Sequence, residues 1–164
     1  MRPFACIMIA LLAIAAPATA SGLDALADGL HTWQVEGTSD VQGCCYGWRS
    51  GKVAKGGCRI DRNSVSVASN GDCAAGPGAA QVYVRMSEGA PVSVWVFSSA
   101  CPVTAEGTIQ DHGTVSAGDS VDWFRSVIES RDVEQDVREK ALFALVQTES
   151  DAAFRYLDRL LTER

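Results

Sequence analysis

Apolar and polar residues alternate along several short segments in the first two thirds of the chain. The two-residue period runs through residues 33–36, 64–67, 81–86 and 92–97. Successive side chains of a strand point to opposite faces of a sheet, so this period predicts β-strands. Ahead of them, the spacing of apolar residues over 21–30 predicts a short helix instead.

Two of these strands are joined by a short connection rich in turn residues. Residues 87–91 read Ser-Glu-Gly-Ala-Pro, which predicts a β-hairpin over residues 80–97. The second strand of the hairpin carries large side chains on both faces, with Trp95 and Phe97 on one side and valines on the other. We therefore expect a central strand covered on both sides, with helices from the end of the chain supplying the second cover.

The apolar spacing changes to three and four residues near residue 119. This period predicts three helices, over residues 120–130, 132–147 and 150–161. Asp119 or Ser120 is the expected cap of the first helix, and Asp132 the expected cap of the second. The connections are so short that neighbouring helices should pack antiparallel.

The composition changes at the same point. Residues 21–119 contain all fifteen glycines, whereas residues 120–164 contain no Cys, Gly or Pro. We expect an α+β protein: a small disulfide-stapled antiparallel β domain at residues 21–119, followed by a helical domain of about three helices at residues 120–164.

The last two helical segments resemble a bacterial HEAT repeat. Residues 132–145 read DVEQDVREKALFAL and residues 150–161 read SDAAFRYLDRLL. The family pattern has an Asp before the first helix, Val-Arg within it, an Ala-Leu core and an apolar second helix, and the resemblance extends over about residues 120–162. The matching positions are Asp132, Val137, Arg138, Ala141, Leu142 and Leu157.

The resemblance implies a structural role for these positions. In HEAT repeats the Arg at the position of Arg138 ties adjacent helices, so an Arg138→Ala substitution should lower stability. Long binding surfaces need three or more stacked repeats, and this chain has about one and a half. The spare apolar face should therefore cover the β domain or, failing that, another chain. An ordinary amphipathic helical hairpin is the alternative interpretation.

The first twenty residues have the pattern of a cleavable secretory signal. One positive charge at Arg2 precedes an apolar run, and small residues stand at Ala18 and Ala20. We expect cleavage after Ala20 and an exported protein, periplasmic or secreted. No later run approaches the ~20 apolar residues of a membrane span, so no membrane insertion is expected after cleavage.

Export changes how the cysteines are interpreted. In an oxidising compartment cysteines form disulfides. The five cysteines that remain after cleavage of the signal allow two bonds and one unpaired thiol. We expect Cys44 or Cys45 to pair with Cys58, and Cys73 or Cys101 to take part in the second bond. No Cys-x-x-Cys pair exists, so neither a metal nor another cofactor is expected. The disulfide candidates are Cys44, Cys45, Cys58, Cys73 and Cys101.

The charge of the chain restricts its partners. A formal net charge of −6 argues against nucleic acid. One cluster of basic residues is an exception to the acidic composition, and it contains a single acidic residue, Asp61. It is either a surface for an acidic protein partner or a solvated, glycine-rich loop. The exposed face of the helix over residues 133–147 is a second candidate surface for a partner. The basic candidates for partner binding are Arg49, Lys52, Lys55, Arg59 and Arg62.

Residues for catalysis are few. His112 lies between Asp111 and Gly113, and the only other histidine is His31. Without a nucleophile elbow, a phosphate-binding loop or paired carboxylates, we interpret His112 as a turn residue. The expected function is a non-catalytic protein-interaction or scaffolding module with an unidentified protein partner. The alternative is a thiol-based redox enzyme or sensor that uses the unpaired cysteine.

Overall fold

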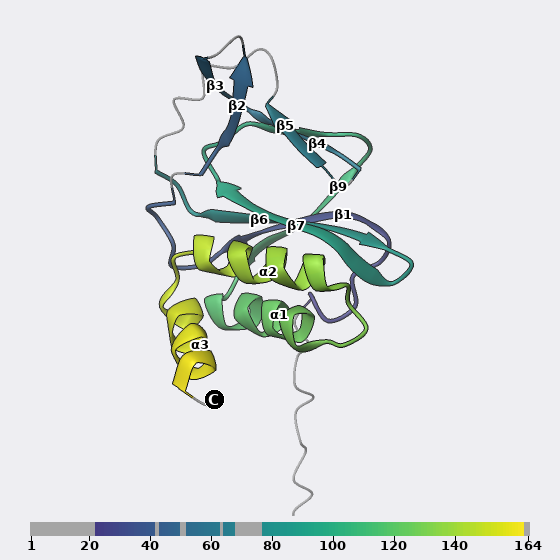
Figure 1. The fold of residues 1–164 in the computed structure, drawn as a ribbon, viewed down its shortest axis with the longest axis vertical. Coiled ribbons are helices and arrows are strands. Elements are labelled where there is room, and N and C mark those ends of the chain that lie inside the picture. Colours follow the sequence, from purple (N-terminus) through teal and green to yellow (C-terminus); the bar gives the residue numbers. More distant parts are fainter. Residues whose placement is uncertain (1–21, 42, 50–51, 63, 68–76, 163–164) are drawn as a thin grey trace, which may run out of the picture.

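The protein is a four-stranded sheet with helices on one face and smaller sheets on the other (Figure 1). The computed structural model describes residues 22–41, 43–49, 52–62, 64–67 and 77–162, with the backbone alone at residues 45–49 and 52–56. The strands are β1 (Gly29–Val35), β2 (Cys45–Arg49), β3 (Lys52–Gly56), β4 (Cys58–Asp61), β5 (Ser64–Val67), β6 (Ala80–Ser87), β7 (Ala90–Ser98), β8 (Val103–Ala105) and β9 (Ile109–Val115). The helices are α1 (Ala117–Glu129), α2 (Gln135–Gln147) and α3 (Asp151–Thr162). The α+β class and the three C-terminal helices are confirmed.

The main sheet has the strand order β7-β6-β1-β9. β6 and β7 form the predicted antiparallel hairpin, and the carboxylate of Asp28 accepts hydrogen bonds from the backbone N–H groups of Glu88 and Gly89 at its turn. β1 pairs with β6 in antiparallel and with β9 in parallel fashion. The prediction that the second hairpin strand is central is wrong, because β7 lies at an edge of the sheet. β7 has large residues on both faces because other elements pack on each face of the sheet, and not because it lies between two strands.

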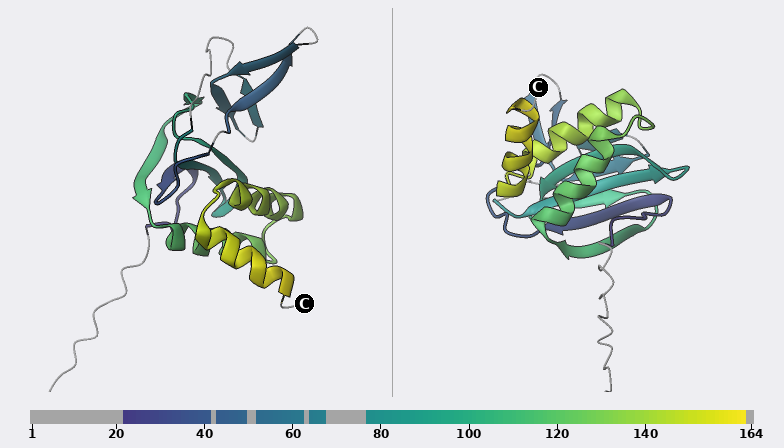
Figure 2. Two further views of the ribbon diagram at one scale, coloured as in Figure 1. Left: turned by 90° about the vertical axis from the view of Figure 1, so that its left-hand side faces the viewer. Right: turned by 90° about the horizontal axis from the view of Figure 1, so that it is seen from below.

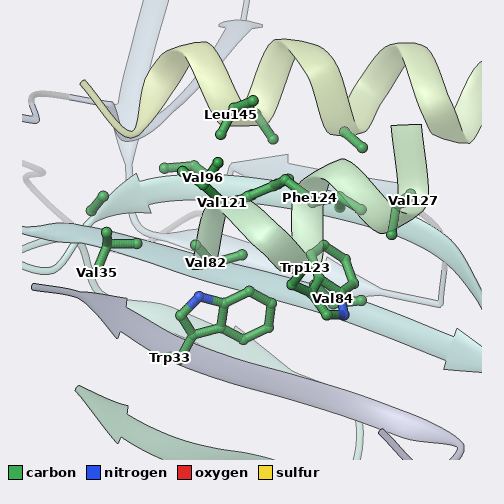
Figure 3. Close-up of a cluster of buried hydrophobic side chains, with 14 of the residues drawn as sticks. Trp33, Val35, Val82, Val84, Val96, Val121, Trp123, Phe124, Val127 and Leu145 are labelled. Carbon is green, nitrogen blue, oxygen red and sulfur yellow. The ribbon is translucent and has the colours of Figure 1, made fainter. Parts of the chain in front are cut away.

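The face of the sheet that carries α1 and α2 holds the larger hydrophobic core. Side chains of the sheet and of all three helices belong to this one core, which therefore spans the predicted boundary near residue 119. The prediction that the helices cover the sheet is confirmed, and the three views show them on the same face (Figures 1 and 2). Figure 3 shows its centre, formed by Trp33, Val35, Val82, Val84, Val96, Val121, Trp123, Phe124, Val127 and Leu145.

The opposite face holds a smaller core. Here Leu30, Tyr83 and Phe97 of the main sheet meet Cys58 and Ile60 of β4. β4 lies at the centre of a three-stranded sheet of order β5-β4-β8, and β2 and β3 form a separate two-stranded sheet. The main sheet is therefore buried on both faces, which explains why β7 has apolar residues at consecutive positions.

The helices begin at residues other than those predicted. Ser116 caps α1, since its hydroxyl accepts a hydrogen bond from the Asp119 backbone N–H at 3.1 Å. α2 begins at Gln135 after Glu134, whose side chain makes no capping hydrogen bond. The predicted caps at Asp119 or Ser120 and at Asp132 are thus wrong by one turn or less. Residues 22–25 form a turn rather than a helix.

The third helix packs more closely against α1 than against α2. Ala153 and Tyr156 of α3 are buried, and the Tyr156 hydroxyl donates a hydrogen bond to Glu129 at the end of α1. The outer residues Phe154 and Leu161 remain exposed. α3 consequently extends the helical layer without covering the sheet directly, as Figure 1 shows.

Candidate functional site

A groove of about 620 Å³ runs between the edge strand β7 and helix α2. Its walls come from Val94, Trp95, Val96 and Phe97 of β7, and its other residues are Gly43, Cys44, Asp136, Glu139, Lys140, Phe143, Ala144 and Gln147. Side chains of neighbouring residues in a strand point to opposite faces. Because four consecutive residues of β7 line the groove, it runs along the outer edge of the strand and is bordered by residues from both faces of the sheet.

The backbone of β7 determines what this edge offers. Ser99 donates a hydrogen bond to the carbonyl of Ala79, which places these two residues at a hydrogen-bonded position of the antiparallel pair. Hydrogen-bonded positions alternate, so the N–H and C=O groups of Trp95 and Phe97 point toward β6. Those of Val94 and Val96 point away from β6 toward the groove, where the Val96 carbonyl lies beside Gly43.

One end of this edge is already paired. The Ser98 N–H donates a hydrogen bond of 2.7 Å to the carbonyl of Gly43, so residue 43 occupies the position of a neighbouring strand. The next residue, Cys44, forms a disulfide with Cys101, and the two Cα atoms are 5.7 Å apart. The disulfide fixes the end of the groove. Beyond it, no described strand pairs with the outer edge of β7.

Helix α2 supplies the other wall of the groove. Lys140 forms an ion pair of 3.0 Å with Asp136, and this hydrogen bond and charge hold the pKa of Asp136 below its usual value. The Glu139 carboxylate accepts a hydrogen bond from Gln135 and has no cationic partner among the described residues. Phe143 is 66% exposed, although aromatic side chains usually lie in the core. The wall is thus apolar with a surplus of negative charge.

The cysteines follow the predicted framework in part. Cys101 takes part in a disulfide as expected, but its partner is Cys44, so the alternative of a Cys44–Cys58 bond is wrong. The Cys58 sulfur lies 3.7 Å from that of Cys101, and Cys58 is disulfide-bonded as well. The side chains of Cys45 and Cys73 lie outside those described. The alternative of a Cys45–Cys58 bond therefore stays a prediction.

The predicted basic cluster is only partly described. Arg59 forms an exposed ion pair with Asp61 at 2.9 Å, which raises the pKa of its guanidinium. Arg62 lines a shallow hollow with Arg85, whose Nε donates to the Arg62 carbonyl. The remaining members, Arg49, Lys52 and Lys55, lie on β2 and β3, whose side chains are outside those described.

The positions that match the HEAT pattern occupy different environments. Val137 and Ala141 are buried, Leu142 and Leu157 are half-buried, and Asp132 is exposed. The Nε atom of Arg138 is buried but has no hydrogen-bond partner among the described residues. The expected tie between Arg138 and a neighbouring helix is thus not made through this atom.

The two histidines, which are 81 residues apart in sequence, meet at the other edge of the sheet. His31 Nε2 lies 2.7 Å from the Ala27 carbonyl, and His31 Nδ1 lies 3.0 Å from His112 Nε2. If His31 donates from Nε2, its Nδ1 accepts from His112. Loss of hydration and the neighbouring His31 lower the pKa of His112, against the opposing effect of Asp111. His112 lies in β9, so its interpretation as a turn residue is wrong.

The pair does not extend into a larger polar cluster. In the described part of the chain, no group of three or more His, Cys, Asp or Glu side chains is arranged to hold a metal ion. Nor does any helix of that part combine the length and apolar character needed to cross a membrane.

No protein-family model, curated protein or solved structure matches the chain. The groove and the histidine pair are therefore judged on their own geometry.

The sequence predicted the exposed face of helix α2 as a partner surface, but not the groove that it forms with β7. The signal for the groove is present in α2, where Phe143 and Val146 lie off the buried face that carries Val137, Ala141 and Leu145. Large apolar residues off the buried face of a helix mark a second contact surface. Only the strand order shows that this surface lies beside an edge of the main sheet.

Proposed function

We propose that this chain is an exported, non-catalytic protein-interaction module, and that it binds its partner in the groove between β7 and α2. One observation carries the proposal: an apolar groove with an exposed phenylalanine lies directly beside a strand edge with which no other described strand pairs. Exposed apolar surface next to buried core is typical of interaction sites. The resemblance of the helices to a HEAT repeat, a family of interaction modules, supports the same class of function.

The position of Phe143 supports binding rather than folding. Phe143 is 66% exposed and Val146, one turn along α2, is 43% exposed. A free chain gains little stability from side chains that stay in water, whereas a partner that covers them buries apolar surface. Aromatic side chains at the centre of a contact usually contribute much of its affinity.

A pair of matched substitutions tests the proposal. Phe154 of α3 is 53% exposed but is not part of the groove, so Phe154→Ser is the control for Phe143→Ser. The oxidised wild-type protein and both variants are immobilised and exposed to the exported proteins of the source organism. We expect at least one bound protein whose retention falls about tenfold with Phe143→Ser and is unchanged with Phe154→Ser.

The contrary result is equally clear. If both variants retain the same proteins as the wild type, or lose them equally, the groove is not the binding site. Thermal unfolding curves accompany the comparison, because both substitutions lie on the surface and should leave stability within about 0.5 kcal/mol of the wild type.

The thiol-based alternative depends on a different part of the chain. Among the described side chains, Cys44, Cys58 and Cys101 are all disulfide-bonded. A reactive thiol would have to come from Cys45 or Cys73, whose side chains lie outside those described. No observation favours this alternative over the interaction module.

A further inference from the structure

We infer that the partner enters the groove as an extended peptide segment and adds as a further strand to the edge of β7. This inference rests on the proposed function, because it names the kind of partner that the same groove would bind. A strand added in this way obtains main-chain hydrogen bonds from the sheet and specificity from pockets for alternate side chains.

The backbone of β7 presents the groups that such a strand needs. The N–H and C=O groups of Val94 and Val96 point into the groove, whereas those of Trp95 and Phe97 are directed to β6. Main-chain groups in an apolar groove are costly to leave unpaired once water is excluded. A helix satisfies its own backbone and offers these groups nothing, so the complementary partner is extended.

The chain itself shows how the added strand would lie. Gly43 already occupies the neighbouring strand position at one end, where its carbonyl accepts a hydrogen bond from Ser98. The path then leaves the edge toward the Cys44–Cys101 disulfide. A partner strand would continue this position along Val96 and Val94, for about five residues at roughly 3.3 Å each.

The walls of the groove define the side chains that fit. One set of alternate side chains would face α2 at Ala144 and Phe143, where small or medium apolar residues can be buried. The other set would pass Trp95 on the opposite face. Glu139 lines the groove and has no cationic partner among the described side chains, while Asp136 and Lys140 neutralise each other. The segment should therefore combine alternate apolar residues with a Lys or Arg near Glu139.

A second copy of this chain is a poorer occupant. Paired strands lie about 4.8 Å apart, whereas packed helices need 8–10 Å between their axes. Helix α2 packs against the edge strand β7 itself. If β7 of another copy paired antiparallel with this edge, both α2 helices would lie on the same face of the joined sheet and would overlap. A segment without a covering helix fits the space, and this favours a peptide over self-association.

The experiment uses a displayed library of random decapeptides and the oxidised full-length protein. Peptides are selected on the wild type and then depleted on Phe143→Ser, which retains only those that need the groove. Each selected peptide is then synthesised as a series with one N-methylated amide at a time. In an extended strand only every second amide faces β7, so N-methylation should weaken binding about tenfold or more at alternate positions.

Charge reversal gives an independent check. We expect Glu139→Lys to weaken the selected peptides about threefold to tenfold at low salt, and less at high salt. The control is Asp158→Lys on α3, which makes the same change of charge on an exposed residue outside the groove. That control should bind the peptides as the wild type does.

Three results would overturn the inference. They are an N-methylation profile that is flat or has a helical period, a library that yields no Phe143-dependent peptide, and sedimentation that shows a dimer abolished by Phe143→Ser. The first leaves the proposed function intact, since the groove would still bind a partner in another conformation. Failure of the Phe143-dependent capture from exported proteins would instead count against the proposed function.

Discussion

Strands β9 and β7 form the two edges of the main sheet, and they differ in sequence and in backbone. β9 exposes Gln110, Asp111 and Thr114, and its pairing with β1 is interrupted opposite Trp33 by an irregularity that contains Gly113 at φ 67°. β7 is nine residues long and its register is regular from Ser98 to Ser93. The backbone groups of β7 that face the groove belong to Val94 and Val96. No residue of β7 has a charged side chain.

The difference separates an edge that repels pairing from one that permits it. Polar side chains, bulges and a short regular stretch are the usual devices that keep sheet edges from joining other chains. β9 has these features in the middle of the strand, whereas β7 has them only near its start, where Pro91 stands and the register with β6 shifts between Ser93 and Pro91. An unprotected edge is a liability unless another segment covers it, so the asymmetry locates the expected partner at β7.

The disulfide anchors the β7 edge, and its loss should have the largest effect. Cys44 and Cys101 are 57 residues apart in sequence, and closing a loop of that size stabilises the folded state by about 4 kcal/mol in the chain-entropy model. The Cys44→Ser/Cys101→Ser double variant should lose about that much in the free energy of unfolding. Urea denaturation measures it, and a loss below about 1 kcal/mol would show that the bond does not hold this end of the groove.

Helix α2 covers β7 but not β9. Substitution of its buried leucine should cause the second-largest loss of stability. Leu145 is fully buried, so Leu145→Ala should lower the free energy of unfolding by about 3 kcal/mol. The control is Leu161→Ala on α3, where the side chain is 78% exposed and the change should stay within about 0.5 kcal/mol. Equal losses from the two substitutions, measured by urea denaturation, would contradict the packing of α2 described above.

At the β9 edge, the irregular backbone should tolerate only glycine. Gly113 has φ 67°, so Gly113→Ala places a side chain in the left-handed region and should cost about 1 kcal/mol. The same substitution at Gly118 in the first turn of α1 meets only ordinary contacts and should be neutral or stabilising. Melting temperatures that move in the same direction for both variants would argue against a constrained bulge.

The histidine pair should make the stability depend on pH in a defined direction. The pKa of His112 is lowered in the folded state, so the unfolded chain takes up the proton at a higher pH. This contribution to stability is fully present above about pH 6.5 and is lost as the pH falls toward the folded pKa. His112→Asn should remove that part of the decline, with His31 and Asp111 unchanged. Identical pH profiles for variant and wild type would exclude the effect.

The sequence predicted individual strands and helices better than their arrangement. Alternation at residues 81–86 and 92–97 identified both strands of the hairpin, because one period describes the two faces of a strand. It carries no information about what lies beside a strand, and β7 was therefore placed at the centre. β9 was missed because Asp111 and Gly113 are typical of a turn, and here they form an irregularity within a strand.

The candidate site was harder to predict for the same reason. The Cys44–Cys101 bond and the His31–His112 contact each join residues far apart in sequence, and spacing along the chain does not determine such pairs. The groove depends on the position of α2 over an edge strand. Only the exposed Phe143 could be recognised beforehand, as an apolar residue off the core stripe.

Hydrogen exchange of the free protein tests the open edge most directly. We expect the backbone amides of Val94 and Val96 to exchange much faster than those of Trp95 and Phe97, although all four belong to one strand. The first two point into the groove and the other two bond to β6. Protection of Val94 and Val96 equal to that of Trp95 in the monomer would contradict the account, because the edge would then already be paired.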